Sequence, residues 1–182
     1  MQALAWDEEL EHVAQNYANQ CSWEHNPDRT IEYLAISTKP DINYVGENLA
    51  SRSSSNSDYP NLISNISLSF DALMYNEALD WTYGTIAGSE TCMGQCGHAT
   101  QIFWANTSLV GCATARCENM HGSNLHSQYL VCNYGQGGNY RDLYPYVVAN
   151  SDEEICSDDR AGQQTQCSQG LTYSAAYEDG LE

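Results

Sequence analysis

Residues 97–104 read GHATQIFW, and this stretch is the most informative one for the fold. It begins with the polar residues His98 and Gln101 and ends in an apolar, aromatic run. One interpretation is a capped helix that leads into a core, where both polar side chains are simply hydrogen-bonded, as most buried polar groups are. The other interpretation is that they face a functional site. The rest of the chain is needed to choose between the two.

The composition restricts the class of protein. The chain has 182 residues, enough for one domain that buries about 70% of the surface its unfolded form exposes. It carries 24 acidic and 6 basic residues, a formal net charge of -18 at pH 7, so it would repel nucleic acid and anionic membranes. No apolar run approaches the roughly 20 residues that a membrane-spanning helix needs. We therefore predict no nucleic-acid partner and no membrane span.

The cysteines indicate an oxidising compartment. Their number, 8, is even and predicts up to four disulfides in a secreted protein. A zinc ribbon is less well supported, because the sequence contains no CxxC pair. Two glycosylation sequons, at Asn65 and Asn106, agree with secretion. We expect a secreted, extracellular glycoprotein that is a monomer or a weak dimer.

Two segments have the periodicity of amphipathic helices. Residues 7–21 place their apolar side chains on one stripe, and the acidic residues at the start suit the positive end of a helix dipole. Pro27 then prevents continuation of the helix and leaves His25 in a turn. A second helix is predicted over residues 69–81. Glu77 lies on its apolar face, where a carboxylate is costly unless it is paired, so Glu77 needs a partner.

The remaining segments indicate strands, a loop and a tail. Residues 109–115 and 128–134 are strand-like runs. Residues 51–58, SRSSSNSD, have no periodicity and are predicted to form a polar loop. The composition becomes strongly acidic towards the C-terminus. We therefore divide the chain into a folded domain, residues 1–145, and an acidic, irregular extension, residues 146–182.

Four motifs in a set order resemble those of the CAP superfamily, which includes venom allergens, plant pathogenesis-related proteins and cysteine-rich secretory proteins. They are ALAWDEELEHVAQNYANQCSWEHN, YVGENLA, GHATQIFWANTSLVGCA and YLVCNYGQGGN. The resemblance implies an α+β fold, a three-layer α-β-α sandwich with disulfides. We predict that the chain belongs to the helminth venom allergen-like proteins. The family has an earlier helix that is missing from this sequence: either the numbering begins late or the domain lacks this helix, and we expect the second.

The resemblance also implies a central cleft lined by two histidines and two glutamates, which are His25, Glu47, Glu77 and His98. These residue types are suitable ligands for Zn²⁺ or another divalent cation, which the cleft is expected to bind only when it is supplied and not as a required cofactor. Affinity is expected to fall below about pH 6, because protonated imidazoles do not bind metal. The alternative is a hydrogen-bonded network that ties loops to helices.

Four disulfides are predicted. A bridge between neighbouring strands is geometrically reasonable for two cysteines in the middle of the predicted strands, and the resemblance supports the same pair. The resemblance implies one further pair, and elimination and proximity supply the last two. In this order the pairs are Cys112–Cys132, Cys21–Cys117, Cys92–Cys96 and Cys156–Cys167.

The resemblance implies a lipid carrier in host interaction or defence, because CAP proteins of several lineages bind sterols or fatty acids. An apolar segment after the polar loop supplies candidate sterol contacts, although ordinary core packing is the alternative for them: Tyr59, Leu62, Ile63, Ile66, Leu68 and Phe70.

Two other functions stay open, a metal-dependent hydrolase or protease at the cleft and an immunomodulatory protein recognised by a host receptor. The sequence contains no GxSxG elbow and no HExxH zinc helix, and it identifies no serine or cysteine nucleophile beside His98. We therefore predict a binding protein rather than an enzyme.

Overall fold

The computed structural model describes residues 3–57, 74–84, 92–120 and 124–146. Four strands form one mixed sheet in the order β1-β3-β4-β2. Strand β1 is parallel to β3, and the other neighbours are antiparallel. The strands are β1 (Ala5–Trp6), β2 (Val45–Ser54), β3 (Leu109–Glu118) and β4 (His126–Gly135).

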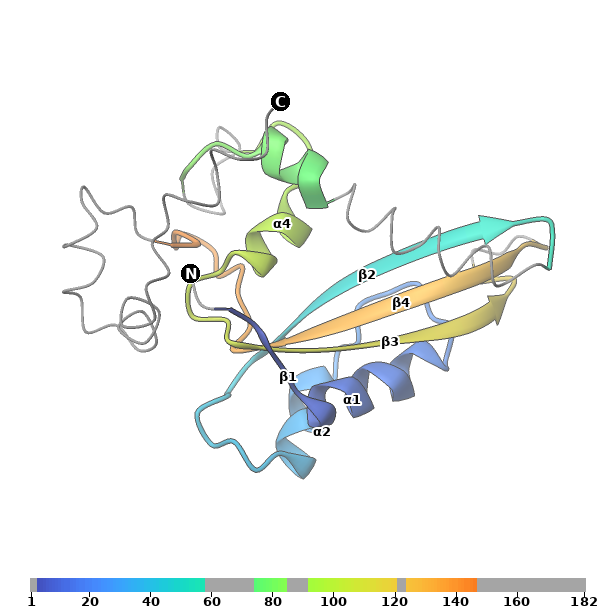
Figure 1. Ribbon diagram of the computed structural model, residues 1–182, viewed down its shortest axis with the longest axis horizontal. Helices are drawn as coiled ribbons and strands as arrows, with labels where there is room; N and C mark the ends of the chain where they lie inside the picture. Colours follow the sequence, from blue (N-terminus) through green and yellow to red (C-terminus); the bar gives the residue numbers. More distant parts are fainter. Residues whose placement is uncertain (1–2, 58–73, 85–91, 121–123, 147–182) are drawn as a thin grey trace.

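Helices cover both faces of this sheet (Figure 1). Helices α1 (Glu8–Ala18) and α2 (Arg29–Ile36) lie on one face, and α4 (Gly97–Ile102) lies on the other together with the helical residues 74–80. The α+β fold with three α-β-α layers is therefore confirmed. Within the described ranges, no helix has the length and apolar character needed to cross a bilayer.

Helix α1 follows directly from its sequence. The Oδ1 atom of Asp7 accepts a hydrogen bond from the backbone N–H of Leu10 at 2.7 Å and so caps the N-terminus. The predicted apolar stripe is buried. A Cβ at Gly111 of β3 would overlap backbone atoms at the start of α1, so glycine is required for the close approach of the helix to the sheet. The helix predicted for residues 7–21 is confirmed and ends at Ala18.

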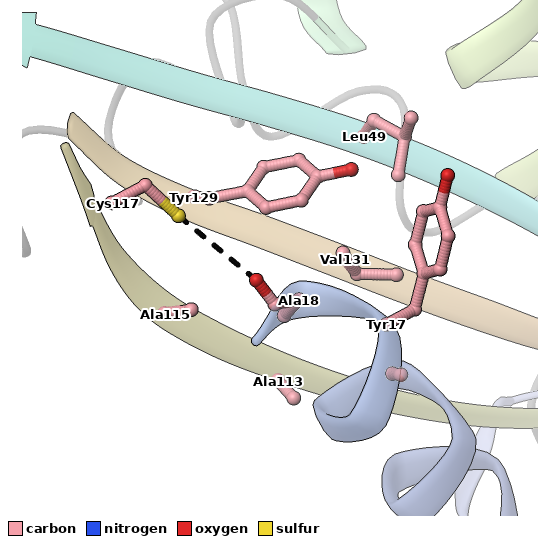
Figure 2. Packing of buried hydrophobic residues seen from close by; sticks show 9 residues of the cluster. Tyr17, Ala18, Leu49, Ala113, Ala115, Cys117, Tyr129 and Val131 are labelled. Atoms are coloured by element: carbon pink, nitrogen blue, oxygen red, sulfur yellow. Dashed lines mark hydrogen bonds between the residues drawn. The ribbon is translucent and has the colours of Figure 1, made fainter. Parts of the chain in front are cut away.

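The core lies between α1 and the strands. Figure 2 shows the rings of Tyr17 and Tyr129 packed there with the smaller side chains of Leu49 and Val131. A second buried cluster joins α1 to α2 around Tyr33. Residues from α1, α2 and three strands thus bury one face of the sheet, and this packing holds β2, which carries Glu47, in a fixed position.

Strand β2 differs from the sequence prediction. The polar loop predicted for residues 51–58 is wrong for residues 51–54, which continue the strand and pair with β4. The hydroxyl oxygens of Ser53 and Ser127 lie 2.7 Å apart across this pairing. The neighbouring strand supplies backbone partners along the whole length of β2, so tertiary pairing overrides the low strand propensity of serine.

Strands β3 and β4 and helix α2 also differ from the sequence prediction. The predicted strands are confirmed but are longer: β3 continues to Glu118, with exposed Arg116 and Glu118 on either side of buried Cys117, and β4 begins at His126, which pairs with Glu118. Helix α2 is not predicted by the sequence, because Tyr33 is its one buried residue in a helix whose other apolar side chains, Ile31, Leu34 and Ile36, are exposed. The apolar side chains of this helix therefore do not form a buried stripe.

Three of the predicted disulfides involve described residues, and all three are confirmed: Cys21–Cys117, Cys92–Cys96 and Cys112–Cys132. Their sequence separations are 96, 4 and 20. Loop-closure entropy then gives contributions of about 5, 2 and 3 kcal/mol, in the same order. The first joins the end of α1 to β3 and stabilises the fold most. Cys156 and Cys167 lie outside the described residues.

Candidate functional site

The first histidine–glutamate pair is formed by His25, in the turn after α1, and Glu47, in β2. The Nδ1 atom of His25 lies 2.8 Å from Oε1 of Glu47. The same oxygen accepts a hydrogen bond from the backbone N–H of Asn26 at 3.0 Å. The side chain of Glu47 is 0% exposed, whereas that of His25 is 62% exposed. A fully buried carboxylate therefore orients a largely exposed imidazole.

The turn that carries His25 is fixed by its neighbours. Asn26 is buried, and its side-chain amide donates to Oε2 of Glu32 in α2 at 2.9 Å. Its side-chain oxygen accepts from the backbone N–H of Asp28 at 3.0 Å, and its carbonyl accepts from Arg29 at 2.7 Å. Helix α2 thus also holds this turn in place, through Glu32 and Arg29.

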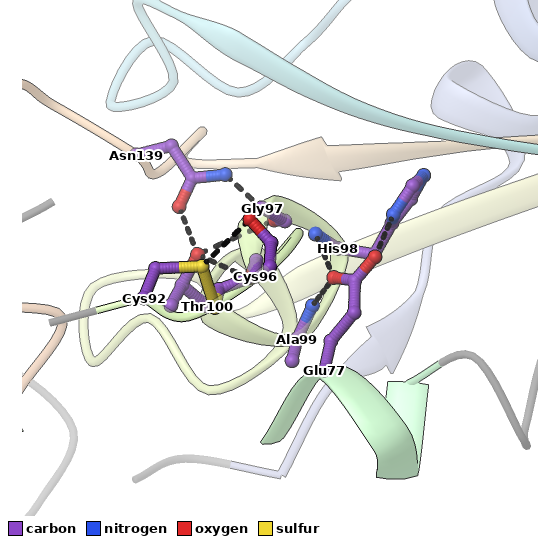
Figure 3. Close-up of a disulfide and its surroundings, with 9 residues drawn as sticks. Glu77, Cys92, Cys96, Gly97, His98, Ala99, Thr100 and Asn139 are labelled. Atoms are coloured by element: carbon purple, nitrogen blue, oxygen red, sulfur yellow. Dashed lines mark hydrogen bonds and ion pairs between the residues drawn. A yellow bond between two sulfur atoms is a disulfide. The ribbon is translucent and has the colours of Figure 1, made fainter. Parts of the chain in front are cut away.

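The second pair is formed by Glu77, in the helical residues 74–80, and His98, in α4 (Figure 3). The Nδ1 atom of His98 lies 2.7 Å from Oε1 of Glu77. The other carboxylate oxygen accepts from the backbone N–H groups of His98 and Ala99, at 2.8 and 3.2 Å. The partner that the sequence requires for Glu77 is therefore His98 together with the first N–H groups of α4, which have no partner within the helix.

Electrostatics favour the charged form of this second pair. The hydrogen bond to Glu77 raises the pKa of His98 against the opposing effect of burial, and the Leu49 backbone carbonyl adds to the increase. Burial raises the pKa of Glu77, but its hydrogen bonds and the charge of His98 bring it below its ordinary value. A neutral imidazole donates from one nitrogen only, whereas the protonated ring can donate to both the Glu77 carboxylate and the Leu49 carbonyl. The protonated form of His98 therefore suits this site best.

Asn48 connects the two pairs. It follows Glu47 in β2, and its side-chain amide donates to the backbone carbonyl of His98 at 3.1 Å and to the hydroxyl of Tyr134 at 3.2 Å. Both Asn48 and Tyr134 are buried. Sequence reasoning did not identify either residue. The signal available was the GEN motif, in which a buried asparagine looks the same as an exposed one.

Gln101 is, besides His98, the other polar residue at the start of GHATQIFW, and its hydrogen bonds account for its place there. Its Oε1 accepts from the backbone N–H of Gly138 at 2.8 Å, and its Nε2 donates to the hydroxyl of Thr107 at 3.2 Å. Gly46 has no room for a Cβ because the Gln101 side chain occupies that space. The first interpretation is therefore correct for Gln101, a satisfied core residue, whereas a functional role for His98, which pairs with Glu77, stays a prediction.

The four predicted ligands come together as two hydrogen-bonded pairs. Among the residues that the structure describes, no group of three or more His, Cys, Asp or Glu side chains is placed to hold a metal ion. Both glutamates already accept from an imidazole, which is the role of a residue that orients a metal ligand. The donor set fits a cation bound through imidazole Nε2 atoms better than a cage of four protein ligands. Metal binding itself stays a prediction.

Other predicted site residues have different outcomes. Asn106 is exposed in the turn between α4 and β3, as a glycosylation site must be. Asn65 lies outside the described residues. The same holds for all six candidate sterol contacts, Tyr59, Leu62, Ile63, Ile66, Leu68 and Phe70.

The comparison with protein families identifies the class of this domain. Residues 1–134 match the model of the cysteine-rich secretory protein family, named CAP. The chain therefore belongs to this family. It is 33% identical to human GLIPR1-like protein 1 over 83% of this chain and 55% of that protein. It is 38% identical to venom allergen 3 of Solenopsis invicta over 76% of this chain and 54% of that protein. The chain spans about half the length of these relatives.

Solved structures agree with this assignment. The fold is similar to NaASP2, crystallised with Zn2+, with a TM-score of 0.59 and 26% identity over 86% of this chain and 70% of that chain. It is also similar to venom allergen-like protein 4 of Schistosoma mansoni, with a TM-score of 0.55 and 19% identity over 84% and 79%. The second similarity shows the fold alone.

Proposed function

We propose that this chain is a secreted CAP-family binding protein that takes up a divalent cation such as Zn²⁺ through His25 and His98, with water completing the coordination. One observation carries the proposal. Each imidazole has its Nδ1 held by a buried glutamate, so a metal would bind Nε2, which in His98 must first give up its hydrogen bond to the Leu49 carbonyl. The similarity to NaASP2, crystallised with Zn2+, supports it. The family assignment and the three disulfides support secretion.

The structure changes the expected pH dependence of this uptake. The pKa of His98 is raised above its ordinary value of 6.5 by Glu77. A metal at Nε2 must displace the proton that the pair favours. As the pH is lowered, zinc affinity is therefore expected to begin to fall while the pH is still above 6.5. Unperturbed histidines would suggest a fall only below about pH 6.

Zinc titration by calorimetry tests the proposal. The double variant His25→Ala, His98→Ala should lose the binding, and Glu47→Gln or Glu77→Gln should weaken it about 10- to 100-fold, as changes in orienting residues do. His12→Ala is the matched control, because His12 lies on α1 and interacts with Asn16. Unchanged zinc uptake by the double variant would place the metal elsewhere and overturn the proposal.

We also propose that the chain binds a sterol through residues 59–70, and a fatty acid in a slot beside the helix predicted to end at residue 81. This proposal rests on the apolar sequence of the segment and on membership of the family. Replacing Tyr59, Leu62 and Ile63 with serine should abolish cholesterol binding in solution, whereas His98→Ala should leave it intact. A folded triple variant that binds cholesterol as well as the parent would show that the segment is ordinary core.

A binding role is proposed in preference to hydrolysis. A histidine held by a carboxylate is also part of a Ser-His-Asp triad, which favours the alternative of a hydrolase. In the described part of the chain, however, the hydrogen bonds of His25 and His98 run to glutamates and backbone, with no serine or cysteine nucleophile among their partners. Zinc-dependent peptidase or esterase activity that His98→Ala abolishes would reverse this preference.

Recognition by a host receptor is compatible with the binding role, and measuring direct binding to host cells, with and without lipid, would test it.

The relatives include insect, mammalian and helminth proteins. Membership of the helminth venom allergen-like subgroup therefore stays a prediction.

A further inference from the structure

The disulfide Cys92–Cys96 lies at the junction of the two segments that carry the second histidine–glutamate pair (Figure 3). Glu77 belongs to the helical residues 74–80 on one side of the junction. His98 belongs to α4 on the other side. The disulfide is therefore placed to hold the carboxylate and the imidazole in one arrangement.

Each end of the disulfide is connected to one of these segments. Cys92 forms an antiparallel bridge with Trp81, and the backbone N–H of Met93 donates to the carbonyl of Asp80 at 3.0 Å. Cys96 is the N-cap residue of α4. Its carbonyl accepts from both the backbone N–H and the hydroxyl of Thr100, each at 2.9 Å. A change at the disulfide is thus transmitted to the last turn of one helix and the first turn of the other.

The surroundings of this disulfide differ from those of the other two. Its three intervening residues are exposed, and Met93 is 81% exposed. In contrast, Cys112–Cys132 links two strands that are paired along their whole length. The cysteines themselves do not differ in this way, because Cys96 is 6% exposed, Cys132 3% and Cys117 1%. A short exposed turn opens locally at lower cost than a paired strand, so we expect Cys92–Cys96 to open to a thiol more readily than the other two disulfides.

We propose that Cys92–Cys96 is a site of thiol–disulfide exchange with a dithiol reductant, and that its reduction loosens the Glu77–His98 pair while the rest of the fold stays intact. This inference concerns regulation of the site described above and in that respect rests on the proposed function. The local effect on α4 does not require a bound metal.

The exchange is a balanced two-electron reaction. A thiolate of the reductant attacks Sγ of Cys92, the sulfur–sulfur bond breaks, and Cys96 leaves as a thiolate that takes up a proton. The second thiol of the reductant then attacks the mixed disulfide and releases Cys92, which is protonated in turn. The products are two cysteine thiols and the oxidised disulfide of the reductant.

Limited reduction under native conditions tests the first half of the proposal. The oxidised protein is treated with dithiothreitol, quenched with acid, alkylated and mapped by mass spectrometry. Cys92 and Cys96 should become alkylated at least about tenfold faster than the other described cysteines, because opening the turn does not require global unfolding. Simultaneous alkylation of all three disulfides, or later alkylation of this one, would overturn the proposal.

Amide hydrogen exchange measured by NMR tests the second half. In the selectively reduced protein, the amides of His98 and Ala99, which donate to Glu77, should exchange at least about tenfold faster, while that of Val131 in β4 is unchanged. The variant Cys92→Ser, Cys96→Ser should show the same rates without reductant, and Gln95→Ala, in the same exposed turn, should not. Unchanged exchange at His98 and Ala99 after selective reduction would disprove the coupling.

A zinc titration of the same samples separates this inference from the proposed function. If the oxidised protein binds zinc, reduction should weaken the binding several-fold. If the oxidised protein binds no zinc, the proposed function fails, while alkylation and amide exchange still decide whether the disulfide controls the pair.

Discussion

The two histidine–glutamate pairs share one contact in different surroundings. In both, a histidine Nδ1 lies within 2.8 Å of a glutamate Oε1. His25 is largely exposed, and Glu47 makes one further hydrogen bond, to the turn that carries the histidine. His98 is mostly buried, and Glu77 also accepts from the backbone N–H groups of His98 and Ala99 in the first turn of α4. The first pair therefore presents an imidazole to solvent, whereas the second is also part of the framework.

The largest expected difference between the pairs is in stability. Glu77→Ala removes three hydrogen bonds and leaves buried donors without a partner, so it should lower the free energy of unfolding by about 3 kcal/mol. Glu47→Ala removes two hydrogen bonds, one of them to an exposed ring, and should cost about 1 kcal/mol. Urea denaturation with the disulfides intact measures both. Equal losses, or a larger loss for Glu47→Ala, would contradict the distinction.

Loss of Asn48, which links the two pairs, should lower the free energy of unfolding less than loss of Glu77 does. Asn48→Ala leaves the carbonyl of His98 and the hydroxyl of Tyr134 without their amide donor. The expected cost is about 1 to 2 kcal/mol in the same denaturation experiment. Asn16→Ala, an exposed change on α1, serves as the control. A cost as small as that of the control would mean that Asn48 does not join β2 to α4.

The second pair should also give stability a characteristic pH dependence. The raised pKa of His98 means that its contribution is complete below 6.5 and is lost as pH rises through the folded value. The lowered pKa of Glu77 means that its contribution is present above 4.5 and is lost as pH falls through the folded value. The pair should therefore contribute most between these limits. The stabilities of wild type and Glu77→Gln, compared from below this range to above it, should differ most within it. A difference that stays constant with pH would contradict the account.

The smallest effect on stability is expected for a change at Tyr129, which lies beneath the first pair. Tyr129 is fully buried, and its hydroxyl has no hydrogen-bond partner among the described residues. Tyr129→Phe removes that unsatisfied group and keeps the ring, so the stability should change by less than about 0.5 kcal/mol or increase. Thermal unfolding checks this. A loss comparable to that of Asn48→Ala would show that the hydroxyl supports Glu47.

The sequence predicted those parts of the fold in which local pattern and tertiary packing agree. Helix α1 has a cap, an acidic first turn and an apolar stripe, and all of these are used in the structure. The second half of β2 consists mainly of serines, and what makes it a strand is the adjacent β4. The first kind of information is local, and the second depends on long-range pairing, which a single sequence does not display.

The candidate site shows the same division. Glu77 attracted attention because a carboxylate on an apolar face needs a partner, and the structure supplies His98. Which histidine pairs with which glutamate could not be derived from spacing, because the members of each pair are about 20 residues apart and belong to different elements. The sequence singles out Gln101 in GHATQIFW and contains Asn48 in the GEN motif, but it does not predict what they contact, because the role of a buried polar residue is recognised only when its partners are known.

The central claim is that glutamates hold both imidazoles by Nδ1 and leave Nε2 as the functional nitrogen. Nitrogen-15 NMR of the histidine rings during a zinc titration at about pH 8 tests it most directly, because neutral imidazole predominates there when histidine is unperturbed. The account predicts that the Nδ1 resonances of His25 and His98 stay protonated while the Nε2 resonances move to metal-bound values. Metal-induced shifts at Nδ1, or an unprotonated Nδ1 in either ring before zinc is added, would contradict it.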